Sequence, residues 1–513
     1  MNRKMKKLLC VLLAGILAAG MTGCTGSRNE EKTQSPTLPP AVVSEKAPDG
    51  DRTVREARDY TIYLPERNDL QPSRSIHLEE ANLQDTAETL VRSMLDMVNG
   101  ERAAQGENRK LSLYQDSQGM EAPLEISGGI CTVNLDPSVL QMTYSERYKL
   151  CIALATTLCA MEEIHGVNLL TAGQSAALDV TGTLAMGTLT AHPGEDLQVL
   201  WEQMEGKRTP LGEDGSKTPM STNATIYYPL PEGRGMICES KMIYFDGQTA
   251  NQMASALLEA LSESFRRKYG SERTPALAEY LLHTPVTSEL KDGGKLITID
   301  FRENIQEMLD QWGTDLPCLV AAVAATLTTF IPGVAAVKMR IGDNPVTETA
   351  GDRFPVQKNP GGMVYRESAE VFLMGTVTVF FEKDGRLTAC EIPVDRHLAD
   401  SPRVLLQALL DGPDRRAAAD GMKSTMPDGA AGEDILGIAA EGDTLLVNMS
   451  ENFRNAVRDA GPEKEELLCY SMVNTLCLNS GMKRVCFFFG EKQAETIAGD
   501  IYWGGEFIYN PGV

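Results

Sequence analysis

The pattern of apolar and polar positions repeats three times along the chain, each time in the order strand, helix, strand. In the third copy the apolar strand LLVNM is followed by a polar gap, the helical stretch LLCYSMVNTLCL and the strand VCFFF. The first strand of each copy ends near a short polar residue, which is Asn134, Asp300 or Asn448. A Thr-Leu pair lies late in each helix and begins at Thr157, Thr326 or Thr475. A long-period internal repeat of this kind predicts tandem domains of one architecture.

Each copy also begins with a short strand and a helix. Runs of β-branched and aromatic residues, which favour strands, occupy 61–64, 225–228 and 378–381. Apolar residues at helical spacing predict helices over 86–98, 250–268 and 402–410. We therefore predict an α+β fold of three tandem β(β)αββαβ domains, with expected boundaries at 59–204, 223–342 and 370–513. Domains of this size bury enough surface to fold without a metal or a disulfide.

The segments outside these elements divide into linkers and candidate additions to the domains. Two polar, turn-rich segments, 205–222 and 343–362, are expected to link the domains. The sequence TGTLAMGTLT at 181–190 is a candidate closing strand of the first copy, and 197–204 is a candidate short helix. The C-terminal residues 501–513 contain several aromatic side chains and are expected to pack on the third domain, because aromatics are rare in disordered tails.

The N-terminal residues predict export. Basic residues precede an apolar run that is too short to span a bilayer by itself, which is typical of a signal peptide and predicts one over 1–23. The small residues directly before Cys24 resemble a bacterial lipobox, in which the cysteine becomes the new N-terminus and carries a lipid such as palmitate. An ordinary secretory signal with an incidental cysteine is the alternative. Residues 24–58, rich in Ser, Thr, Pro and charge, are expected to form a disordered tether.

The charge of the chain restricts its partners. The 71 acidic residues exceed the 48 basic residues, and the formal net charge is −23. So acidic a chain argues against nucleic acid as a partner and against charge-driven adhesion to anionic lipid. We therefore expect contact with the membrane through the N-terminal lipid alone, at the extracytoplasmic face of a bacterial cell membrane.

Motifs of catalysis, cofactor binding and metal binding are not found in the sequence. There is no GxSxG, P-loop, dinucleotide-binding or HExxH pattern. No spacing typical of a metal site relates the histidines, which are His77, His165, His192, His283 and His397. The cysteine pairs 151/159 and 469/477 are eight residues apart on helices, a rise of about 12 Å, so neither pair can form a disulfide within its helix. We expect no enzyme, cofactor or metal ligand, although a metal site assembled from distant segments is left open.

The repeated polar residues Asn134, Asp300 and Asn448 are the positions most typical of a site. One interpretation makes them ligand contacts. The interpretation that we favour is that short polar side chains satisfy backbone groups where a strand passes into a loop. The aromatic residues of the first strands similarly form either a patch for peptide or glycan, or, as we favour, part of the core.

The third copy resembles a known family. The matching stretches are VTVFF, VLLQALLDGP, the turn Met426-Pro427-Asp428-Gly429, LLVNMSENF and the helix end VNTLCLNSGMKRV. Together they resemble the GerMN domain of sporulation and germination lipoproteins. The resemblance implies an α/β module similar to the ring-building domains of sporulation envelope proteins, and it implies no catalytic residues.

Three hypotheses for function follow. The resemblance implies a lipid-anchored scaffold that assembles with envelope or sporulation-complex proteins. The alternative is a lipoprotein of vegetative cells that binds peptidoglycan or another extracellular ligand. A cell-wall hydrolase is the third, and only the predicted compartment supports it.

Overall fold

The computed structural model describes residues 46–513 except for 53–57, 66–69, 71, 79–81, 108–109, 116–118, 212, 272, 292 and 500. The predicted signal peptide 1–23 and the lipidation residue Cys24 lie outside the described residues. Within the described part the fold is mixed α/β, as predicted.

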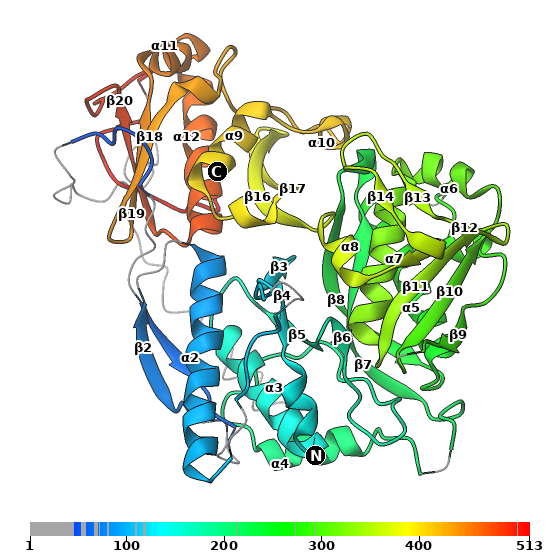
Figure 1. Ribbon diagram of the computed structural model, residues 1–513. Coiled ribbons are helices and arrows are strands. Elements are labelled where there is room, and N and C mark those ends of the chain that lie inside the picture. Colours follow the sequence, from blue (N-terminus) through cyan, green and yellow to red (C-terminus); the bar gives the residue numbers. More distant parts are fainter. Residues whose placement is uncertain are drawn as a thin grey trace, which may run out of the picture.

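The same series of elements occurs three times, in segments that we call units 1, 2 and 3 (Figure 1). Unit 1 consists of β1 (Arg58–Ile62), β2 (Arg74–Leu78), α2 (Leu83–Ala104), β3 (Glu125–Ser127), β4 (Ile130–Leu135), α3 (Tyr144–Leu158), β5 (Gly166–Thr171) and β6 (Gln174–Ser175). Unit 2 consists of β7 (Met220–Pro229), β8 (Met236–Phe245), α5 (Ala250–Tyr269), β9 (Val286–Glu289), β10 (Lys295–Phe301), α6 (Ile305–Trp312), α7 (Leu316–Phe330), β11 (Val334–Ile341) and β12 (Asn344–Pro345). Unit 3 consists of β16 (Met374–Lys383), β17 (Arg386–Asp395), α9 (Pro402–Asp411), β18 (Ile435–Glu441), β19 (Thr444–Met449), α11 (Glu451–Ala460), α12 (Pro462–Ser480), β20 (Arg484–Phe489) and β21 (Phe507–Ile508).

Each unit has a separate two-stranded hairpin and a main sheet. The main sheets have the strand orders β3-β4-β5-β6, β9-β10-β11-β12 and β18-β19-β20-β21. In each, the two middle strands are parallel and the outer pairings are antiparallel. Parallel neighbours need a crossover connection, and α3, α7 and α12 supply it. The predicted boundaries 59–204, 223–342 and 370–513 remain a prediction.

The repeated threonine makes the same hydrogen bond in all three units. Its Oγ1 accepts from a backbone amide of the hairpin, at 3.1 Å in unit 1, 3.0 Å in unit 2 and 3.2 Å in unit 3. The threonines are Thr157, Thr326 and Thr475, and the respective donors are Tyr63, Tyr227 and Phe380. This bond joins the crossover helix to the hairpin, so the periodic threonine is a specific contact as well as a packing residue. Tyr227 and Phe380 are buried, which agrees with the core interpretation of the aromatic strands.

The crossover helices are enclosed on nearly all sides. In α7 every residue from Pro317 to Phe330 is buried. A helix that is surrounded in this way is apolar all round, and therefore has no polar stripe in its sequence. No single helix in the described part of the chain has the length and hydropathy of a membrane span; α6 and α7 reach these limits only as a pair, which is bent by 94°.

Units 1 and 2 share one hydrophobic core, whereas unit 3 has its own. A single cluster of buried apolar residues runs from Ile62 to Leu373, and a second begins at Val377. A buried polar network also joins the first two units: Asn168 Oδ1 accepts from the hydroxyls of Thr188 and Thr225, each at 3.0 Å. Unit 3 is therefore the part of the chain that can unfold with the least effect on the other two.

The predicted linker 343–362 is not a simple connector. Together with the residues up to 373 it packs on unit 2 and forms β15 (Met363–Val364), which pairs with β11, and α8 (Arg366–Glu370). Arg366 is buried and lies 2.5 Å from Glu125 Oε2 of β3. The same guanidinium hydrogen-bonds to Thr329 and, at 3.2 Å, to the hydroxyl of Tyr227. The segment that follows the predicted linker thus places a buried cation at the junction of units 1 and 2.

Glu370, also on α8, makes this junction sensitive to pH. Burial raises the pKa of its carboxyl from 4.5 to about 8; the charge of Glu125 and a hydrogen bond with it add to the rise, and Arg366 and Arg396 oppose it. As the pH increases from about 4.5 to 8, the unfolded chain loses this proton before the folded chain does, so folding stability falls across that window.

We expect Glu370→Gln to remove the pH-dependent contribution of Glu370 to folding stability. The fall in Tm between about pH 5 and 8 should then be smaller than in the wild type. Thermal unfolding at a series of pH values measures it. Glu367→Gln is the matched control, because Glu367 lies on the same helix and is exposed. Equal slopes for wild type, the Glu370 variant and the control would contradict the expectation.

Residues 46–52, inside the predicted tether 24–58, are packed against unit 3 instead of being disordered. In Figure 1 they are the short dark-blue trace beside β18. Arg52 pairs with β18, donating to Ile438 O at 2.7 Å and accepting from Ala440 N at 3.0 Å. Asp51 binds the Arg403 guanidinium through both oxygens, at 2.6 and 2.9 Å. The N-terminal segment therefore contacts unit 3, although unit 1 follows it directly in the sequence.

A small apolar cluster lies beneath this segment. Ala47 packs with Leu446, Cys486 and Phe488, which face outward from the unit 3 sheet. The segment thus covers apolar side chains that the sheet would otherwise expose.

The C-terminal residues pack on unit 3, as predicted. β21 pairs with β20, and Trp503 is fully buried. Glu465, buried on α12, accepts from the Trp503 indole at 2.8 Å and from the amides of Ala498 and Ile501 at 3.0 and 3.3 Å. The predicted closing strand 181–190 is not a strand: within it only Leu189 makes a bridge, to Val167. The short helix expected at 197–204 is α4 (Leu197–Glu205).

Candidate functional site

The three repeated polar residues lie at equivalent places but in different sheets, so the structure does not bring them together. In unit 1, Asn134 Oδ1 accepts from Gly173 N at 3.0 Å. In unit 2, Asp300 Oδ1 accepts from Asp343 N at 3.2 Å. Both donors lie in the tight turn that follows the parallel neighbour strand. The side chains thus satisfy turn amides, which is the interpretation that the sequence favoured.

Asn448 differs from the other two. Its Nδ2 donates to Pro48 O at 3.0 Å, and the residue is buried by the segment 46–52. The polar position of unit 3 therefore binds the N-terminal segment of the chain itself. A ligand role for these three residues remains a prediction.

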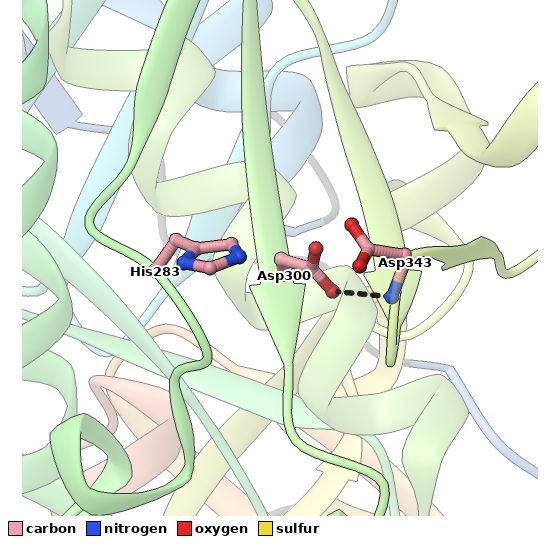
Figure 2. A group of neighbouring side chains, drawn as sticks. All are labelled: His283, Asp300 and Asp343. Atoms are coloured by element: carbon pink, nitrogen blue, oxygen red, sulfur yellow. Dashed lines mark hydrogen bonds between the residues drawn. The ribbon is translucent and has the colours of Figure 1, made fainter.

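Asp300 has two further neighbours that the sequence spacing did not indicate. His283 and Asp343 lie beside it, and the ligand atoms of the three side chains are all within 4.8 Å of one another. Figure 2 shows the imidazole and the two carboxylates in a row across the ends of adjacent chain segments. His283 and Asp343 are far apart in the sequence, and only the pairing of strands brings them together.

A groove with a volume of about 920 Å³ lies in unit 3. We call it the unit 3 groove. One wall is the loop 423–430, and the other is α11 with the first turns of α12. The residues that line it include Lys423, Met426, Asp428, Ala430, Asn452, Asn455, Ala456, Asp459, Glu463 and Leu467. The rim carries charges and amides, while alanine and longer apolar side chains supply the floor.

Specific hydrogen bonds hold the loop wall in place. The backbone of Lys423 pairs with that of Glu382 at the end of β16, with distances of 2.8 and 3.0 Å. The Thr425 hydroxyl lies 2.6 Å from that of Ser471 on α12. The loop contains the turn Met426 to Gly429, which the resemblance had marked. It is therefore a fixed wall, anchored to both the hairpin and the crossover helix.

The helix wall occupies part of the stretch that the sequence indicated as a polar gap. α11 buries only Phe453 and Val457 and presents Asn452, Asn455 and Asp459 outward. Ser450 is the N-cap residue of α11. Its Oγ accepts from Phe453 N at 3.0 Å, which is typical of a helix start. This serine and the spacing of the two apolar residues are the signal that could have predicted the helix, which was not predicted from the sequence.

The described cysteines are unsuited to nucleophilic chemistry. All nine are free, and burial is the main cause that raises the pKa of each thiol. Cys159 and Cys486, for example, have pKa values of about 11 and about 12. Since the thiolate is the nucleophile, these residues are unreactive at neutral pH.

The fold is a series of α/β units, and in each unit a buried helix connects two parallel neighbouring strands. Residues 378–495 match the Germane family, described as sporulation and spore germination. Unit 3 is therefore a Germane domain, and the resemblance found in the sequence is confirmed there. The unit 3 groove lies within the matched residues.

Two solved structures are similar to parts of the chain. The tandem GerMN domains of the sporulation protein GerM from Bacillus subtilis are 15% identical, with 56% of this chain and 97% of that one covered and a TM-score of 0.23. A Clostridium perfringens protein described provisionally as a lipoprotein is 16% identical, with 26% of this chain and 87% of that one covered and a TM-score of 0.19. No curated protein matches the chain.

Proposed function

We propose that this protein is a lipid-anchored extracytoplasmic scaffold of sporulation or germination envelope complexes, and that it is not an enzyme. The observation that carries the proposal is the unit 3 groove, which lies within the residues that match a sporulation and germination family. The predicted lipid on Cys24 would hold the chain at the membrane surface, and the folded units would present the groove to a partner.

The chemistry of the groove suits a segment of another protein. Its rim includes the exposed acids Asp428, Asp459 and Glu463, and the exposed amides Asn452 and Asn455. These groups would pair with basic side chains and with the backbone of an extended or helical segment. The small side chains of the floor leave room for apolar groups of that segment, as in other groove-bound peptides.

Site-specific photocrosslinking in intact cells tests the proposal. A photoreactive residue at Asn455, on the groove face of α11, is compared with one at Glu307, which is exposed on the corresponding helix α6 of unit 2. We expect a sporulation-specific adduct with an envelope protein at position 455 and none at 307. Identical adducts at both positions, or no protein adduct at 455, would overturn the groove as the scaffold's binding site.

The same experiment separates the scaffold from the alternative. Crosslinking of position 455 to glycan alone, in growing as well as sporulating cells, would support a wall-binding lipoprotein. Cys24→Ala tests the anchor: we expect the variant to leave the membrane fraction, and full retention there would contradict lipid anchoring.

A further inference from the structure

We propose that His283, Asp300 and Asp343 of unit 2 form a binding site for a divalent transition-metal ion. Three adjacent chain segments supply the residues. The segment with His283 pairs with the end of β10, where Leu282 N donates to Asp300 O at 2.7 Å. Asp343 lies in the turn between β11 and β12. The site is thus at the carboxyl ends of the parallel strands β10 and β11, which is where α/β sheets commonly bind ligands.

The spacing of the side chains suits one ion. The imidazole nitrogen and the two carboxylate oxygens are all within 4.8 Å of one another. Ligand bonds to zinc are about 2.0–2.2 Å long, so ligands on one ion lie about 3–4 Å apart. Figure 2 shows the His283 imidazole facing Asp300 and the carboxylates of Asp300 and Asp343 directed at each other, so side-chain rotations would bring the three ligand atoms to that spacing.

An unsatisfied buried oxygen is the independent observation that points to a cation. The Asp300 side chain is only 5% exposed, and its Oδ1 is used by the turn amide of Asp343. Its Oδ2 is buried and has no hydrogen bond. Arg340 forms a long ion pair with Oδ2, and its Nε lies 3.6 Å away, which is beyond hydrogen-bonding distance. A buried carboxylate oxygen without a hydrogen bond is costly, and a bound metal ion would satisfy it.

Arg340 sets the charge and the orientation of the site. Its guanidinium binds Asp343 through Oδ1 and donates to the Asp343 carbonyl at 3.0 Å. This contact orients the Asp343 carboxylate and neutralises one of the two acidic charges. Asp300, Asp343 and Arg340 together carry one net negative charge, which favours a cation but limits its affinity.

The ligand types distinguish among metals. One imidazole and two carboxylates suit zinc, manganese, cobalt or nickel, whereas calcium prefers oxygen ligands alone. Units 1 and 3 have the neutral amides of Asn134 and Asn448 at the position of Asp300, and these amides bind backbone groups of the chain. His283 is exposed and also lines a cavity of about 540 Å³, so solvent ions reach the site.

A calorimetric titration of the full-length protein with ZnCl₂ tests the site. We expect one equivalent of zinc to bind, and we expect His283→Ala and Asp343→Asn each to lower the affinity at least tenfold. His192→Ala is the matched control, because His192 and Glu195 form a partly exposed pair at 3.0 Å that resembles an adventitious surface site. That variant is expected to bind zinc as the wild type does.

Cobalt provides a second readout. Visible absorption of the Co²⁺-loaded protein is expected to change in His283→Ala and not in His192→Ala. The exposed His283 has no role in the core, so its variant is expected to keep the wild-type Tm without metal. The proposal would be overturned if zinc did not bind, if calcium alone bound, or if His283→Ala and His192→Ala had equal zinc affinities.

Discussion

Arg366→Met is expected to lower the unfolding free energy of units 1 and 2 by about 3–5 kcal/mol, because it leaves the buried carboxylate of Glu125 without its cation. Arg366 is buried among β3, β7, α7 and its own helix, so its loss leaves the ion pair with Glu125 broken in a buried place. The same change removes the contact of the guanidinium with the Tyr227 ring, whose centroid lies 5.4 Å away. Urea unfolding, monitored by tryptophan fluorescence, measures the loss of unfolding free energy.

The three tryptophans of the chain make the measurement specific. Trp312 reports on unit 2 and Trp503 on unit 3, while Trp201 lies in α4 and packs on Tyr148 of unit 1. With the other two changed to phenylalanine, each tryptophan follows one unit. We expect the Trp312 transition to move to lower urea and the Trp503 transition to stay, because unit 3 has its own core.

A double variant controls for the loss of side-chain volume. Glu125→Met together with Arg366→Met removes both charges, and we expect it to recover most of the stability, since apolar pairs often replace buried ion pairs without cost. An equal shift of all three tryptophan transitions would contradict separate cores. A double variant no more stable than Arg366→Met would contradict the unpaired carboxylate as the cause.

Replacing residues 46–52 with a Gly-Ser linker of equal length is expected to raise the rate of Cys486 labelling by a maleimide at least tenfold. Cys486 is fully buried under the segment, and burial raises the pKa of its thiol to about 12. Removal of the segment exposes the sulfur and lowers the pKa toward its ordinary value. Both changes increase the amount of reactive thiolate at pH 8.

The labelling needs a background in which the other partly exposed cysteines are absent. Cys159, Cys390 and Cys477 are therefore changed to serine in both proteins. Cys469 is the internal control, because it lies in the core of unit 3 and is expected to remain unlabelled. Unchanged labelling of Cys486 in the linker variant would show that the segment does not cover the sheet in solution.

The sequence predicted the repeated elements well because their signals are local. Apolar runs with β-branched residues predicted the strands, and helical spacing predicted α5 and α9 to within one residue and the central part of α2, which extends beyond the predicted 86–98 at both ends. α11 was missed because it buries only two apolar residues, too few for a periodic pattern. The sequence also pointed to Asp300, because its position recurs in the repeat, but not to His283 or Asp343, which have no counterpart elsewhere.

Contacts between distant segments could not be predicted in the same way. Segment 46–52 has the composition of a tether, yet the glycine at 437 leaves a space into which Pro48 and Gly50 fit. A Cβ at that position would lie 2.6 Å from the Pro48 carbonyl oxygen. Nothing near residues 46–52 in the sequence indicates this fit.

The sequence by itself determined most of the repeated strands and helices and the resemblance of the last unit to the Germane family, because each depends on residues close together in the chain. Only the tertiary structure decided that units 1 and 2 share a core, that Arg366 pairs with Glu125, and that His283 meets two aspartates. These outcomes depend on which surfaces lose water together when the chain folds. Burial brings together residues that are remote in sequence, and local sequence patterns do not predict which of them will be in contact.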